Sequence, residues 1–153
     1  MRIETKSLST KKKLDKSEVV SNKKGNFLEA LRQIENPLDI PIDIEDIEQD
    51  DLMSLAGLIE QYGETLSNNP SPENFNLYKK HIRLFIKILQ ANYEVKDTVS
   101  RISFSKQKLY KTVEEVDKNL SEIAQMILSK EKSRLSYLKL VNSIKGLLID
   151  LIL

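Results

Sequence analysis

The sequence predicts an all-α protein: an antiparallel bundle of four main helices, preceded by a short N-terminal helix and a disordered basic tail. Apolar residues recur at alternating steps of three and four after Asp46, which is the period of an amphipathic helix. Hydrophobic residues make up 40% of the chain, enough for several helices to share a core. We expect a tail over 1–25, a short helix and an acidic extended segment over 26–50, and the bundle over 51–153.

The N-terminal region changes character twice before the bundle begins. Residues 1–25 are rich in Lys, Ser, Thr and Asn, with too little apolar surface to offset the entropy of ordering them. A short helix should follow, carrying Phe27, Leu28, Leu31 and Ile34, and it should stop before Pro37. Between Pro37 and Ile47, prolines and alternating aliphatic and acidic residues favour an extended segment.

The first bundle helix and the start of the second have the clearest signals. The first carries the apolar seam Leu52, Leu55, Ile59, Tyr62 and Leu66. It should end at Asn68-Asn69-Pro70. Ser71 then supplies an N-cap hydroxyl, Pro72 suits the first helical position and Glu73 places an acid in the first turn. Because the connection is short, the two helices should pack antiparallel.

The second bundle helix should be buried between neighbours, because it carries two apolar seams. One seam is Phe75, Tyr78, Ile82, Phe85, Leu89 and Tyr93, and the other is Leu77, Leu84, Ile88, Val95 and Val99. We expect it to end within Arg101–Ser105, where Ser103 or Ser105 would cap the next helix.

The last two bundle helices each have one seam. The seams are Leu109, Val113, Val116, Leu120, Ile123 and Ile127, then Tyr137, Val141, Ile144, Leu148 and Leu151. No Gly or Pro separates them, so a single helix from Lys106 to Asp150 is the alternative to a break near Glu131–Ser133.

Charge is segregated along the chain although the formal net charge is only +1. Residues 1–25 hold eight basic and three acidic residues, net +5. Residues 35–74 hold eleven acidic and no basic residues, whereas residues 75–153 hold fifteen basic and eight acidic ones, net +7. The acidic stretch 39–51 is expected to fold back on the basic C-terminal half, with docking to a basic partner as the alternative.

The sequence lacks the combinations of residues from which zinc sites, His-assisted nucleophiles and glycine-rich phosphate sites are usually built. It has no cysteine, one histidine, His81, no Glu-x-x-His pair and no glycine-rich phosphate loop. We therefore predict no catalytic, metal or cofactor-binding residues, and a protein that is not an enzyme. His81 is expected on a helix surface, while Gly57, Gly63 and Gly146 are expected where helices approach closely.

Location is predicted from what the termini lack. The N-terminus shows no apolar run of the kind a secretory signal requires, and the apolar stretch Ile144–Leu153 is far too short to cross a bilayer. Together with the lack of cysteine, this favours the cytoplasm.

Three segments of the predicted bundle have distinctive patterns. They are Asn-Pro-Ser-Pro-Glu-Asn-Phe-Asn-Leu-Tyr-Lys-Lys at 69–80, Lys-Leu-Tyr-Lys-Thr-Val-Glu-Glu-Val-Asp at 108–117, and Ile-Lys-Gly-Leu-Leu-Ile-Asp-Leu at 144–151. In these segments the chain resembles the YaaR-like family of small, uncharacterised bacterial proteins. The resemblance covers residues 27–153 and leaves out the tail. It implies an all-α bundle in the cytosol and brings no site residues with it.

Two surfaces are candidates for interaction. The apolar C-terminus could form a docking surface from Leu147, Leu148, Leu151, Ile152 and Leu153. In the tail, Lys11, Lys12 and Lys13 could make electrostatic contacts. We expect a protein-protein interaction or adaptor module that binds an unidentified protein or itself. The alternative is a nucleic-acid-associated accessory protein that uses the tail and the basic C-terminal half; no membrane and no small-molecule substrate is predicted.

Overall fold

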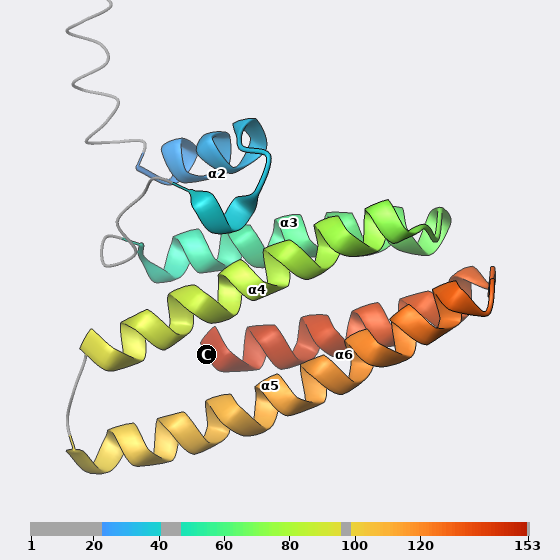
Figure 1. Cartoon of the computed structure of the whole chain (residues 1–153). Coiled ribbons are helices and arrows are strands. Elements are labelled where there is room, and N and C mark those ends of the chain that lie inside the picture. The colour runs from blue at the N-terminus through green and yellow to red at the C-terminus, as the bar shows by residue number, and fades with distance from the viewer. Residues whose placement is uncertain (1–22, 41–46, 96–98, 153) are drawn as a thin grey trace, which may run out of the picture.

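The computed structural model of the chain describes residues 23–40, 47–95 and 99–152. The helices are α2 (Lys23–Gln33), α3 (Gln49–Asn68), α4 (Pro72–Val95), α5 (Val99–Leu128) and α6 (Arg134–Ile152), with a single 3-10 turn, η1 (Pro37–Asp39), between α2 and α3. No strand occurs within these ranges. The predicted all-α class is therefore confirmed (Figure 1).

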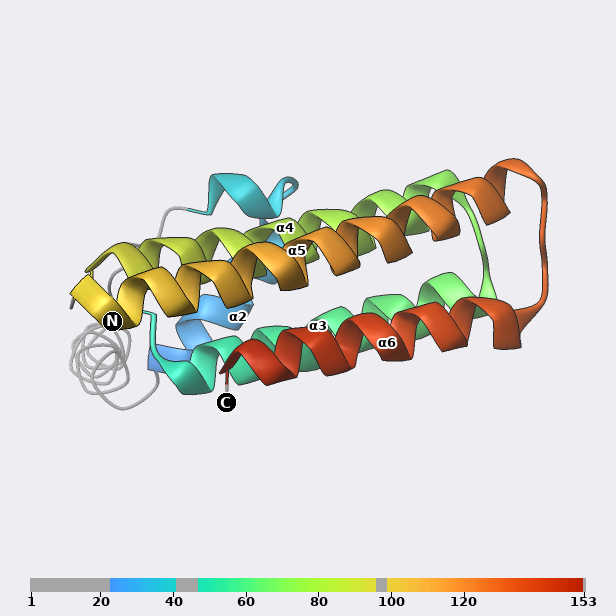
Figure 2. The ribbon, with the colours of Figure 1, turned by 90° about the horizontal axis from the view of Figure 1, so that it is seen from below.

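Four long helices form an antiparallel bundle. Each of α3, α4 and α5 packs against the next helix along the chain, and α6 closes the ring by packing against α3. Seen from below, α4 lies beside α5 and α6 lies beside α3 (Figure 2). The α3–α4 and α5–α6 turns consequently lie at the same end of the bundle. Short connections make sequential neighbours antiparallel, as expected.

The predicted seams supply the core. All five seam residues of α6 are buried, as are four of α3 and the central residues of α4 and α5. Among the largest fully buried side chains are Tyr78, Tyr137, Phe85, Leu55 and Ile123. At roughly 1.5 to 3 kcal/mol for each large apolar side chain, this burial is the main favourable term in the stability of the fold.

The start of α4 matches the sequence signal. The backbone N–H of Asn74 donates to Ser71 Oγ (3.1 Å), which makes Ser71 the N-cap and places Pro72 at the first helical position. The side-chain amide of Asn74 also donates to Asn69 O (2.8 Å), so this residue of α4 connects the start of its helix to the end of α3.

The break between α5 and α6 is confirmed, and backbone hydrogen bonds explain how it forms without Gly or Pro. Lys130 adopts a positive φ of 62°. Its N–H donates to Ile127 O (3.1 Å), and the N–H of Glu131 donates to Met126 O (2.9 Å). These two bonds define a Schellman cap with a lysine at the position that glycine usually fills. Tyr137 Oη then donates to Glu131 O (2.7 Å) and fixes the turn to α6.

Several predicted boundaries need correction. The second bundle helix ends at Val95, and Val99 already belongs to α5, so residues 99–105 begin a helix rather than end one. The expectation that Ser103 or Ser105 caps this helix is therefore wrong, because both serines lie inside α5. The short helix begins at Lys23, inside the segment predicted to be tail.

The ends of the acidic segment lie against the protein itself. Residues 37–39 are a 3-10 turn rather than extended chain: Asn36 Oδ1 accepts from the N–H of Leu38 (3.3 Å), and this turn packs on α4. Leu38 and Ile40 pack against the core, and Ile47 is buried. Residues 41–46 lie outside the described ranges. The described ends of this segment therefore agree with internal docking.

The three glycines inside bundle helices do not share one environment. A Cβ added at Gly63 would overlap Val141 Cγ1 on α6 and lie 3.2 Å from Tyr78 Cε1, so α3 approaches its neighbours closely there. A Cβ at Gly57 or Gly146 would meet nothing within 4 Å. Close helix approach therefore explains Gly63, and the same expectation is wrong for the other two.

Candidate interaction site

His81 is a buried structural residue, which corrects the expectation that it lies on a helix surface. It is only 2% exposed, because it shares the inward arc of α4 with Tyr78 and Ile82. Its Nδ1 donates to Leu77 O (2.7 Å), since a carbonyl oxygen can only accept. The ring packs on Tyr62 at a centroid distance of 4.3 Å. Burial lowers the pKa of His81, and the hydrogen bond to Leu77 opposes that shift.

The described ranges contain no group of three or more His, Cys, Asp or Glu side chains that could hold a metal ion. One carboxylate, that of Asp51, is nevertheless buried. Its Oδ2 accepts from the N–H of Glu48 (3.0 Å), which places Asp51 in the first turn of α3 as part of a capping box. Its burial has a structural role at this helix end.

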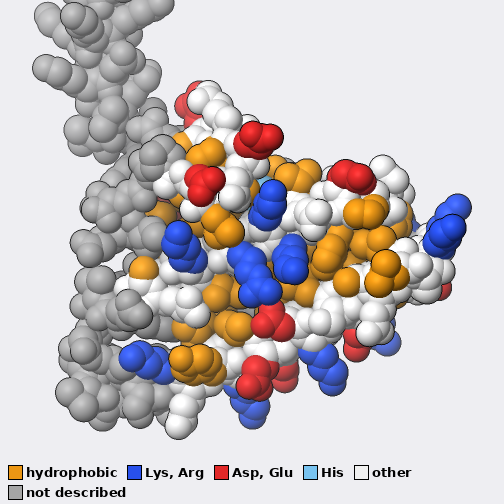
Figure 3. All heavy atoms as spheres, viewed as in Figure 1, with side chains coloured by type: hydrophobic (Ala, Val, Ile, Leu, Met, Phe, Trp, Pro, Cys, Tyr) orange, Lys and Arg blue, Asp and Glu red, His pale blue; other side chains and the backbone are white. Residues whose placement is uncertain are grey.

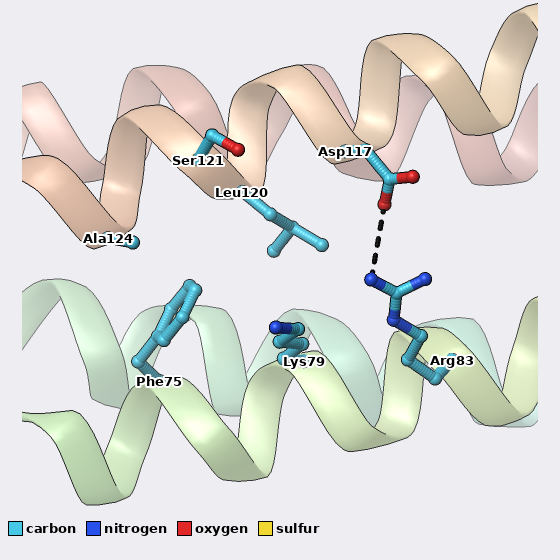
Figure 4. A pocket seen from close by; sticks show the side chains of 7 residues that line it. All are labelled: Phe75, Lys79, Arg83, Asp117, Leu120, Ser121 and Ala124. Carbon is cyan, nitrogen blue, oxygen red and sulfur yellow. Dashed lines mark ion pairs between the residues drawn. The ribbon is translucent and has the colours of Figure 1, made fainter.

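The surface carries a hollow of about 280 Å³ between α4 and α5. Phe75, Lys79 and Arg83 reach it from α4, and α5 contributes Asp117, Leu120, Ser121 and Ala124 (Figure 4). One end is polar, because Arg83 Nη2 lies 3.5 Å from Asp117 Oδ1. The other end is lined by the apolar side chains of Phe75 and Ala124. The Nζ atom of Lys79 lies 6.0 Å from the centre of the Phe75 ring.

Two further hollows continue this one toward the end of the bundle that carries the turns. A second, of about 230 Å³, shares Phe75 and Ala124 with the first and adds Ile127 and Leu128. A third, of about 310 Å³, shares Ile127 and Leu128 with the second and reaches the α5–α6 turn. Because neighbouring hollows share their linings, we treat all three as one surface, the α4–α5 furrow.

The furrow has an apolar floor with basic residues on its rim. Leu128 is 81% exposed although it is a large apolar residue. The basic residues along the furrow are Lys79, Arg83, Lys130 and Lys132, and the acidic ones are Asp117 and Glu131. The α4 and α5 face shows Lys and Arg side chains gathered near its middle and hydrophobic side chains toward the end with the turns (Figure 3).

The C-terminal docking surface predicted from the sequence does not coincide with the α4–α5 furrow. Leu148 and Leu151 are 1% and 6% exposed, and Leu147 and Ile152 pack against the core. The C-terminal leucines therefore form part of the α6 packing surface, which corrects the expectation of an open patch there. Leu153 and the tail lysines Lys11, Lys12 and Lys13 lie outside the described residues.

Sequence reasoning missed the α4–α5 furrow for a physical reason. Phe75 was correctly placed on a seam, but the depth of the furrow comes from the small side chains Ser121 and Ala124 facing it. Both small residues flank the α5 seam, but the sequence does not show which helix they face, so no sequence signal identifies the furrow.

Within the described ranges, no helix combines the length and the apolar character that crossing a membrane requires.

Comparison with known families places the chain in one of them. The model of the family described as "Protein of unknown function (DUF327)" matches residues 3–152. This family includes the YaaR-like proteins, so the resemblance noted from three segments is confirmed. The match also covers most of residues 1–25, which the resemblance had left out. No curated protein and no solved structure matches the chain.

Proposed function

We propose that this chain, which belongs to the DUF327 family of proteins of unknown function, is a non-enzymatic helical-bundle protein that acts by binding another protein. The observation that carries the proposal is the α4–α5 furrow, where Leu128 and the half-buried Phe75 form an uncovered apolar floor. Contiguous apolar surface rimmed by polar groups is typical of protein interaction sites.

The buried polar groups support a binding role over a catalytic one. His81 and Asp51 are engaged with the backbone of their own helices, and neither lines the furrow. A catalytic site needs a nucleophile or acid-base pair converging in a pocket. An ion pair of the furrow, Arg83 with Asp117, is half-exposed on both sides, so water screens the attraction between the two groups.

We further propose a cytoplasmic location. The chain has no cysteine that would benefit from an oxidising compartment, which supports a reducing one.

Affinity capture tests the proposed function. The tagged full-length protein is incubated with bacterial lysate, with and without nuclease treatment, and bound proteins are identified by mass spectrometry. A protein partner retained after nuclease treatment is expected. Light scattering over a range of concentrations measures self-association in parallel. A strict monomer that retains no protein would contradict the proposal.

Nucleic-acid binding is the second candidate, and one observation favours it. Lys80, Arg83 and Lys87 are exposed at spacings of three and four on α4, so their cations share one side of the helix. Phosphate contacts of this kind would make binding fall steeply with salt concentration. An oligonucleotide titration at low and high salt tests this, together with replacement of Lys11, Lys12 and Lys13 by alanine. Absence of binding at low salt would exclude the alternative.

A further inference from the structure

The α4–α5 furrow has dimensions that suit one particular kind of occupant. From Pro72 to Arg83 its α4 side is eleven residue steps long, which is about 17 Å, or three helical turns. Its two walls are neighbouring antiparallel helices. A third helix can place a ridge of apolar side chains along the groove between two such helices.

The charged residues along the α4–α5 furrow indicate which net charge an occupant should carry. Of the two acidic residues along the furrow, Asp117 is paired with Arg83, and Glu131 Oε1 accepts from the N–H of Ser133 (3.0 Å). Lys79 sits beside the apolar floor at one end, while Lys130 and Lys132 flank the other. Both ends of the furrow are thus left with a surplus of positive charge, which favours an acidic occupant.

Two occupants from this chain itself are disfavoured by the same charges. The N-terminal segment 1–25 has a net charge of +5, so the furrow would repel it. Two furrows facing each other across a two-fold axis would bring a basic end of one copy against a basic end of the other, because Lys79 lies toward one end and Lys130 and Lys132 lie at the other. Like charges brought together in this way oppose association.

We propose that the α4–α5 furrow binds an acidic amphipathic helix of a partner protein. Leucine-type side chains on one face of that helix would cover Phe75, Ala124 and Leu128, and flanking Asp or Glu residues would contact Lys79, Lys130 and Lys132. The inference rests on the proposed function and adds to it the surface and the chemical class of the partner.

A designed peptide tests the proposal directly. The probe is a fluorescein-labelled peptide of about 18 residues, with Leu at helical spacing on one face and Glu and Ala elsewhere, measured by fluorescence anisotropy against the full chain. Saturable binding is expected. Replacing every Glu of the peptide by Lys should weaken binding about tenfold or more, because the charge match is inverted.

Matched variants of the protein locate the binding. Leu128→Asp should weaken binding about tenfold or more, and Lys79→Glu about fivefold, since both residues line the furrow. The controls are Leu135→Asp, a leucine 75% exposed near the same turn, and Lys118→Glu, an exposed lysine of α5; neither lines the furrow. Both controls should bind like the unchanged protein. Circular dichroism checks that every variant remains folded.

Several results would overturn the proposal. They are the absence of saturable binding, equal binding of the Lys peptide, or loss of binding in the controls to the same extent as in the furrow variants. Displacement of the peptide by a single-stranded DNA would reassign the furrow to nucleic acid. A change of oligomeric state in the Leu128→Asp variant would reassign it to a second copy of the chain. If the peptide fails but nuclease-resistant capture of a partner succeeds, only this site is wrong and the proposed function stands.

Discussion

The close approach of α3 to α6 at Gly63 makes a prediction that runs against helix propensity. In an exposed helix interior, Gly→Ala is favourable by about 1 kcal/mol. At Gly63, however, the new methyl group would overlap Val141 Cγ1 and lie 3.2 Å from Tyr78 Cε1. Both neighbours are buried, so neither side chain can turn out to solvent. Overpacking typically costs about 1 to 3 kcal/mol, and direct overlap with a buried side chain places Gly63→Ala at the upper end, which leaves a net destabilisation of about 2 kcal/mol.

Gly57 and Gly146 provide matched controls on the same two helices. An added Cβ meets nothing within 4 Å at either position, so Gly57→Ala and Gly146→Ala should each stabilise the protein by about 1 kcal/mol. For a chain of this size, Gly63→Ala should lower the melting temperature by roughly 4 to 8 °C, and each control should raise it by roughly 2 to 4 °C.

Thermal and urea denaturation followed by circular dichroism measures all three variants. A double variant, Gly63→Ala with Val141→Ala, removes the methyl group that causes the overlap. Its loss of stability should therefore be smaller than the sum of the two single losses. If Gly63→Ala proves as stabilising as the two controls, α3 and α6 do not pack as closely as described, and the reasoning is refuted.

Three further predictions follow from local structure. Lys130→Gly should stabilise the protein by about 1 kcal/mol, because Lys130 has a φ of 62°, and a lowered melting temperature would contradict this. Ser71→Ala should cost about 1 kcal/mol in urea denaturation, since the N–H of Asn74 loses its acceptor; an unchanged midpoint would argue against the cap. Stability should fall on acidification below about pH 6.5: the folded state holds the pKa of His81 below that ordinary value, so the unfolded chain binds the proton first. The His81→Phe variant should lose less stability than the unchanged protein between pH 7 and pH 5, and an equal loss would assign the effect to other groups.

Helix existence and the core were predictable because they depend on local periodicity. The seam from Tyr137 to Leu151 repeats at steps of three and four, and every one of its residues is buried. Helix ends were predictable where chemistry marks them, as at Ser71 and Pro72. The turn at Lys130 was predictable only because one apolar seam ends and another begins there. Its cap is formed by backbone hydrogen bonds, which lysine can make as well as glycine, so no residue type marks the turn.

The environment of polar residues was harder to predict from the sequence. His81 lies three residues after Tyr78 and one before Ile82, so its spacing places it on the buried side of α4. We nevertheless predicted a surface position, because histidine is a polar residue. Its burial is made possible by Leu77 O and the Tyr62 ring, and Tyr62 comes from another helix. At the apolar C-terminus the error was the opposite one, since apolar residues were predicted to be exposed. Periodicity identifies an apolar helix face but does not show whether another helix covers it. Here α3 covers it.

The candidate site could not be predicted because it depends on the distance between two helices. Ser121 and Ala124 are unremarkable within the sequence of α5, and only their position opposite Phe75 makes a hollow. Likewise, the exposure of Leu128 follows from where the Schellman cap ends α5.

Site-specific photo-crosslinking in living bacteria tests most directly whether the α4–α5 furrow is where this protein meets its partner. Benzoylphenylalanine is placed at Ser121, which lines the furrow, or at the adjacent Glu122, which is equally exposed but does not line it. The account predicts a discrete adduct with another protein from position 121 and none from position 122. An adduct from 122 alone, or equal adducts from both, would contradict it.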